Sequence, residues 1–206
     1  MRELCVVLLA PEVDPAGVAA AEAALENRGF EVFTRVVLGP DSPEFVPPAF
    51  HGGGHALIAF NELMTGGSGA TRAGFADFEV EKAAHLLAAT VPEPDQCLRV
   101  TADAALAARL ARGLLPQREL ERLAETIAAR KAAMASEEPV LADLSRFKYR
   151  AKVELIRWND QTAIKKTFRR SGLDAMAREL AFHDDVCPVS DVPPRVLGRS
   201  ENAIVF

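Results

Sequence analysis

The chain is poor in cysteine and has no long apolar run. Its 206 residues include three cysteines, Cys5, Cys97 and Cys187, and none of them belongs to a CxxC pair. An odd number without paired spacing predicts neither a disulfide framework nor a zinc site, and it is typical of a cytoplasmic protein. No stretch reaches the roughly 20 apolar residues that a membrane helix needs, so we expect no membrane span.

An excess of positive charge is also absent. Lysine and arginine number 24 against 29 acidic residues, which gives a net charge of −5 and argues against nucleic acid as a partner. Residues 146–170 are the exception, because they hold nine basic residues and only two acidic ones, Glu154 and Asp160. This block is either a phosphate-binding surface or the solvated edge of a small sheet.

Hydrophobic residues make up 49% of the chain, which is enough to form the core of one large or two small domains. The first hundred residues alternate strand and helix patterns. The spacing predicts strands at 4–9, 30–38, 55–60 and 96–100, with helices over 15–28 and 78–89. This β-α-β-β-α-β order is typical of the ferredoxin-like fold.

Two alanine-rich helices are predicted next, over about 102–112 and 117–135, and Ser136-Glu137-Glu138-Pro139 ends the second. The fold class is therefore α+β. We expect a ferredoxin-like domain over 1–116, a connector helix over 117–138, and a small antiparallel sheet with one helix over 139–206.

The last third of the chain carries the most specific pattern. A strand-like run, Val153–Trp158, and an Asn-Asp turn precede Thr162-Ala163-Ile164-Lys165-Lys166. A helical segment with Glu179 follows, and then another strand-like run to Phe206. A lysine on a strand that pairs with a glutamate on the next helix holds the ATP phosphates in kinase folds.

Residues from about 140 to 206 thus resemble the N-terminal lobe of the protein-kinase-like superfamily, with Ala163-Ile164-Lys165 matching its V-A-I-K motif. The resemblance implies a site for ATP with Mg²⁺, in which Ala163 faces the nucleotide, Lys165 binds the phosphates and Glu179 holds Lys165. Strand alternation sends the neighbouring Lys166 to the opposite face. Only the register of the family motif favours Lys165 over Lys166.

The chain departs from this family at two places. Where the glycine-rich loop would have glycines, the sequence has Arg146, Lys148 and Ala151, whose side chains prevent the close backbone approach of glycine. The catalytic-loop and DFG residues have no counterpart. We therefore expect this chain to be the N-terminal part of an ATP-dependent phosphotransferase that is inactive alone. Exposed apolar side chains, such as Val153, Ala163 and Phe206, should make it self-associate or require its missing lobe.

The first hundred residues resemble nucleoside diphosphate kinase more faintly, through Leu8–Asp14, Gly17–Phe30 and Gly69–Phe75. The family's motif lysine is replaced by Ala10, and its phosphorylated histidine has no counterpart. Two alternatives therefore stay open for this part: a nucleoside-diphosphate-kinase-like phosphotransferase, or a non-catalytic regulatory or dimerisation module.

Three other patterns have a simpler interpretation. His51-Gly-Gly-Gly-His55 could chelate a metal, but a loop that enters a strand explains it better. Thr65–Arg72 is glycine-rich and lacks the lysine of a P-loop. Glu179 could also form an ordinary surface ion pair on a helix that packs on a hairpin.

Overall fold

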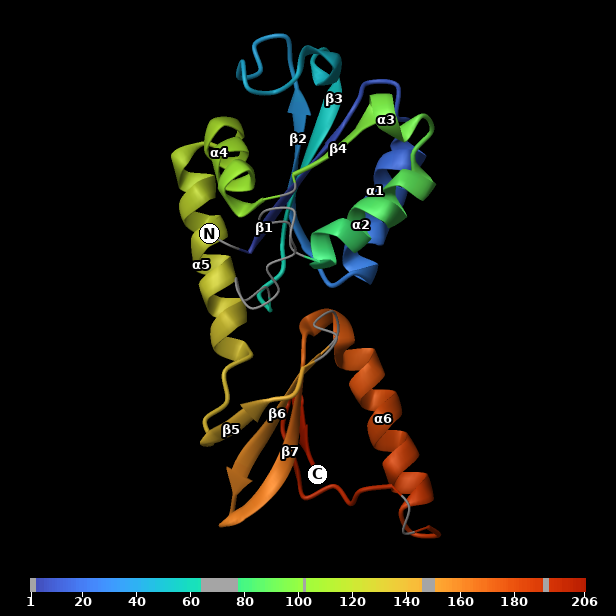
Figure 1. The fold of residues 1–206 in the computed structure, drawn as a ribbon, viewed down its shortest axis with the longest axis vertical. Coiled ribbons are helices and arrows are strands. Elements are labelled where there is room, and N and C mark those ends of the chain that lie inside the picture. The colour runs from blue at the N-terminus through green and yellow to red at the C-terminus, as the bar shows by residue number, and fades with distance from the viewer. Residues whose placement is uncertain (1–2, 64–77, 102, 146–150, 191–192) are drawn as a thin grey trace. The chain divides into compact units, whose positions relative to one another are not determined.

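The computed structural model describes residues 3–63, 78–101, 103–145, 151–190 and 193–206. Within these ranges the chain is a mixed α+β protein with two antiparallel sheets and six α-helices (Figure 1). It divides into two compact units, Met1–Arg130 and Lys131–Phe206. No helix among the described residues is both long and apolar enough to cross a membrane.

The first unit is built on a four-stranded sheet in the order β2-β3-β1-β4, and all its neighbouring strands are antiparallel. The predicted strands all form, with boundaries that differ by at most a few residues. They are β1 (Leu4–Leu9), β2 (Glu31–Leu38), β3 (Gly54–Phe60) and β4 (Leu98–Val100).

Helices cover both faces of this sheet. Figure 1 shows α1 (Pro15–Asn27) and α2 (Phe78–Thr90) on one side, and α4 (Ala104–Leu114) with α5 (Gln117–Ala133) on the other. A short 3₁₀ turn (Pro48–Phe50) and the four-residue α3 (Pro94–Cys97) lie in the connections. Because both faces are covered, every residue of β1 is buried, which accounts for its uninterrupted apolar sequence.

Local signals set the helix ends. The Asp14 carboxylate accepts a hydrogen bond from the Gly17 N–H at 2.7 Å, so Asp14 caps α1 as its sequence position predicts. Gly29, with φ of 77°, lies just beyond the end of the same helix. Asp103 caps α4 in the same way, through the Leu106 N–H at 2.7 Å.

The second unit is a five-stranded antiparallel sheet in the order β5-β6-β7-β9-β8, with one long helix. Its elements are β5 (Val140–Asp143), β6 (Ala151–Trp158), β7 (Gln161–Phe168), a 3₁₀ turn (Arg170–Gly172), α6 (Leu173–Val186), β8 (Gly198–Arg199) and β9 (Ala203–Val205). Asn159 and Asp160, at φ of 46° and 63°, form the tight turn of the β6–β7 hairpin.

The two faces of this sheet pack against different partners. On one face, Phe168 and Ile204 pack with Met176 of α6, and we call this the helix face. On the other, the back face, Ala163 packs with Ile156 and Val205. Successive residues of β7 therefore point to opposite sides, and this alternation decides the geometry of the two consecutive lysines.

Candidate functional site

The sequence motif predicted that Lys165 pairs with Glu179, and this prediction is wrong. The Lys166 ammonium instead forms the ion pair with the Glu179 carboxylate, on the helix face. Lys165 lies on the back face, where its Nζ donates to Glu138 Oε2 at 2.5 Å. The register of the β6–β7 pairing places the two lysines on opposite faces, because Lys166 lies opposite Val153 of β6 and Lys165 lies opposite Glu154.

Ala163 shares the back face with Lys165, because the two residues are two positions apart on one strand. It is 3% exposed and packs in the back-face core. The prediction that Ala163 is an exposed apolar residue is therefore wrong. Of the three residues assigned to a nucleotide site, the structure brings only Glu179 to the helix face, and Lys166 joins it there.

Three apolar side chains lie in a row next to Lys166. Leu155 of β6 is directly opposite Ile164 of β7, and Ile164 exchanges two backbone hydrogen bonds with Phe206, at 3.0 and 2.8 Å. Directly opposed residues point to the same face, so all three side chains lie on the helix face. Ile164 is 41% exposed, and Leu155 and Phe206 are half-buried. We call this set the apolar row.

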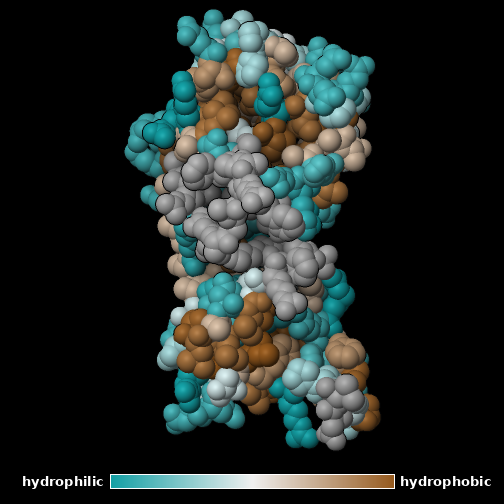
Figure 2. Space-filling view, viewed as in Figure 1, coloured by the Kyte–Doolittle hydropathy of each residue, from teal (hydrophilic) through white to brown (hydrophobic). Residues whose placement is uncertain are grey.

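The apolar row and the ion pair are close in space. Lys166 is two residues beyond Ile164 on β7, which corresponds to about 7 Å along the strand. Figure 2 shows apolar surface over strands of the second unit. Of the strongly exposed large apolar residues in these strands, Ile164 lies on the helix face, whereas Val140, opposite Ile156, lies on the back face. On the helix face, Lys166 thus lies near the exposed side chain of Ile164.

Packing of α6 holds Glu179 over Lys166. The His183 ring is buried, with its centroid 4.8 Å from that of Phe206 and 5.5 Å from that of Phe182. Glu179 is four residues before His183 and so lies on the same side of the helix. The contact with Phe206 therefore connects the position of the Glu179 carboxylate to the end of the apolar row.

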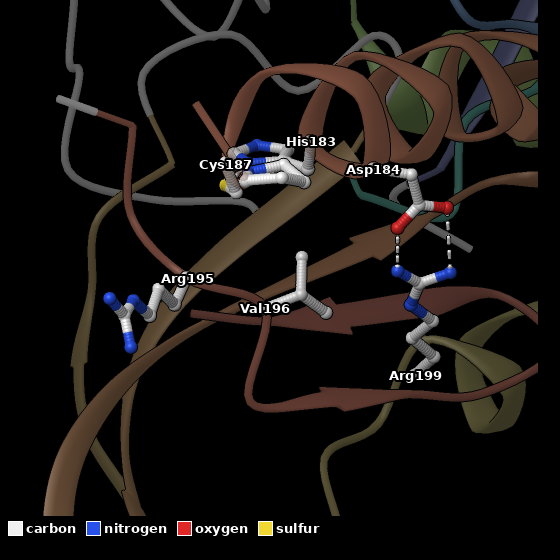
Figure 3. Close-up of a pocket in the computed structure, with 7 residues that line it drawn as sticks. His183, Asp184, Cys187, Arg195, Val196 and Arg199 are labelled. Carbon is white, nitrogen blue, oxygen red and sulfur yellow. Dashed lines mark hydrogen bonds and ion pairs between the residues drawn. The ribbon is translucent and has the colours of Figure 1, made fainter. Parts of the chain in front are cut away.

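A separate cavity of about 300 Å³ lies at the C-terminal end of α6 (Figure 3). The Asp184 carboxylate and the Arg199 guanidinium form a two-pronged ion pair at its side, and this hydrogen bonding lowers the pKa of Asp184. The Cys187 Sγ is 3.5 Å from Nδ1 of His183. The cavity is also lined by Pro188, Arg195 and Val196.

Sequence reasoning did not find this cavity. In the sequence, the four-residue spacing of His183 and Cys187 is the local signal for the cavity. Arg195 and Arg199 reach the cavity from a separate segment. The cavity has the size and polarity for a small polar molecule. Nothing in its geometry selects a particular chemistry.

Among the described residues of the first unit, His51 and His55 have surroundings other than a metal site. His51 Nε2 is 3.0 Å from the Val46 carbonyl oxygen, and the buried Nδ1 of His55 has no hydrogen-bond partner among the described residues. Burial and the charge of Arg35 lower the pKa of His55, against an opposing effect of Glu22. No group of three or more His, Cys, Asp or Glu side chains in the described residues could hold a metal ion.

Several predicted features lie outside the described residues. They include the glycine-rich stretch Thr65–Arg72, the segment Gly69–Phe75 that resembles nucleoside diphosphate kinase, and the basic positions Arg146 and Lys148. Ala10, which replaces that family's lysine, is described and lies buried just after β1.

Comparison of this chain with protein-family models, with curated proteins and with solved structures finds no match. The candidate site is therefore interpreted from its own geometry.

Proposed function

We propose that residues 140–206 bind ATP, as its Mg²⁺ complex, and serve as the nucleotide-binding part of a phosphotransferase of the protein-kinase-like type. In this proposal Lys166, in place of Lys165, contacts the phosphates, and Glu179 orients the Lys166 ammonium. The observation that carries the proposal is the Lys166–Glu179 ion pair beside the partly exposed apolar row, on one face of one sheet.

The dimensions of this surface suit a nucleotide. The apolar row spans three adjacent strands, or about 10 Å, and so offers a flat apolar area for a purine ring. The Lys166 ammonium is a compact charge at one side of the row, where it can neutralise phosphate oxygens. Glu179 reduces the rotational freedom of Lys166, so that less entropy is lost when the phosphate binds.

The order of elements supports the same proposal. The second unit has five strands with one long helix between the third and the fourth, which is the order that the kinase-lobe resemblance implies. In the shifted register, Ile164 stands two residues before the lysine, where the V-A-I-K motif has alanine. The larger isoleucine side chain extends the apolar row and brings it closer to a bound base.

For the first unit we propose a ferredoxin-like fold with a regulatory or dimerising role. Its β-α-β-β-α-β order and strand arrangement support the fold. Helices cover both faces of its sheet, and Ala10 offers no amine to a phosphate where the nucleoside-diphosphate-kinase motif has lysine. These two features favour a non-catalytic role over nucleoside-diphosphate-kinase chemistry.

Calorimetric titration of the full chain with Mg·ATP and with adenosine tests the proposed function. We expect a dissociation constant for Mg·ATP on the order of 0.1–1 mM, because one protein surface supplies the contacts and the free energy is only about −4 to −5.5 kcal/mol. Adenosine should bind at least about tenfold more weakly, since it has no phosphate for Lys166. Equal affinity for the two, or no saturable heat with Mg·ATP, would refute the proposal.

A further inference from the structure

The segment that precedes β5 is fastened across the back face of the second sheet. We call residues 133–138 the strap. Its side chains or carbonyl oxygens contact β6, β7 and the residue before β9, through the pairs Glu138–Lys165 at 2.5 Å, Ser136–Glu154 at 2.5 Å, Met134–Lys152 at 3.3 Å and Ala133–Asn202 at 2.9 Å.

The strap neutralises charges that the sheet would otherwise bury. The Lys165 side chain is only 11% exposed and that of Glu138 is 20% exposed. Glu154, directly opposite Lys165, is also buried, and it is paired with Lys152 at 2.5 Å. Partial burial alone would raise the pKa of Glu138, but the hydrogen bond and charge of Lys165 outweigh burial and lower it. Removing Glu138 would therefore leave a buried ammonium without its closest partner.

We propose that Glu138 is a positioning residue for the nucleotide site: by holding Lys165 on the back face, it keeps Lys166 on the helix face. This inference rests on the proposed function. Adjacent residues of a strand point to opposite faces, so a rotation of β7 that brings Lys165 toward solvent also turns Lys166 away from Glu179. Each lysine has an acid on its own face, Glu138 for Lys165 and Glu179 for Lys166, and the two ion pairs together hold the two ammonium groups on opposite faces.

The strap also has a defined origin in the chain. It continues directly from α5, whose residues up to Arg130 belong to the first unit. Arg130 is itself held within the first unit by a two-pronged ion pair with Glu31, at 2.7 and 2.9 Å. The segment that leaves the first unit is thus continuous in sequence with the strap that pairs with Lys165.

The first arm of the test measures lysine orientation without any nucleotide. The full chain is acetylated with a limiting amount of an N-hydroxysuccinimide ester, and fragment-ion mass spectrometry follows the rates at Lys165 and Lys166. In Glu138→Gln we expect both lysines to react about fivefold faster or more, while the exposed Lys131 reacts at its wild-type rate. Acceleration at Lys165 alone, or at neither lysine, would overturn the proposal.

The second arm measures Mg·ATP affinity in matched variants. Glu138→Gln should weaken binding about fivefold, and Glu137→Gln, at the exposed neighbouring position, should not. The double variant Glu138→Gln/Lys165→Gln should restore wild-type affinity, because it removes the buried charge and keeps an amide hydrogen bond. Equal affinity of Glu138→Gln and Glu137→Gln would overturn the positioning role. If the wild-type chain binds no Mg·ATP, the proposed function fails, and the acetylation arm still decides the role of Glu138.

Discussion

Lys166→Ala is expected to weaken Mg·ATP binding about 10- to 100-fold, because a hydrogen bond to a charged group contributes about 1.5–3 kcal/mol and each 1.4 kcal/mol is a factor of ten. The fold should tolerate the change. The Lys166 and Glu179 side chains are 30% and 26% exposed, and an ion pair this open to solvent stabilises a protein by about 0–1 kcal/mol. Displacement of a fluorescent ATP analogue measures the affinity, and thermal unfolding measures the stability.

Arg157→Ala is the matched control. Arg157 is an exposed cation on the helix face of the same β6–β7 hairpin. It lies two positions after Leu155 along β6. Its loss should change the affinity by less than about twofold, because its guanidinium lies at the turn, where it donates to the Asp160 carbonyl oxygen. Similar losses in both variants would mean that ATP is attracted by the general positive charge of the hairpin.

Gly54→Ala is expected to destabilise the first unit by about 3 kcal/mol or more, which is the upper end of the cost of overpacking. A Cβ at this position would lie 2.3 Å from the Phe50 carbonyl oxygen and 2.6 Å from that of Leu9. Both atoms belong to the backbone: the Leu9 oxygen to the end of β1, which pairs with β3, and the Phe50 oxygen to the 3₁₀ turn before β3, so neither can move aside without a backbone shift. Chemical denaturation followed by circular dichroism measures the loss.

Gly39→Ala controls for the general effect of replacing glycine by alanine. Gly39 directly follows β2, and a Cβ there would meet no atom within 4 Å. We expect a change of about 1 kcal/mol or less, and a stabilising sign is compatible with the lower entropy of the unfolded alanine chain. A Gly54→Ala chain as stable as Gly39→Ala would contradict the close backbone approach at Gly54.

Much of the fold could be predicted from the sequence because its signals are local. The apolar run Leu4–Leu9, the Asp14 cap and Gly29 define β1 and α1 within a few residues. The turn at Asn159-Asp160 likewise defines the β6–β7 hairpin. In each case a few consecutive residues carry both the pattern and the physical reason for the structure.

The lysine register could not be predicted in this way. Lys165 and Lys166 are identical side chains on adjacent positions, so the motif by itself does not say which of them faces the helix. The decision comes from partners distant in sequence: Glu138 is 27 residues from Lys165, and Glu179 reaches Lys166 only through the packing of α6. The back face also gives Lys165 a structural role, because its side chain is only 11% exposed and is paired there with Glu138.

Methyl NMR tests most directly whether ATP binds on the helix face of the second sheet, as we propose. The full chain, labelled at its isoleucine and leucine methyl groups, is titrated with Mg·ATP. We expect saturable shifts at Leu155 and Ile164, which lie in the apolar row, and none at Ile156 on the back face or at Ile58 in the first unit. Shifts confined to Ile58 and its neighbours, or no shift at any methyl group at about 10 mM Mg·ATP, would contradict the account.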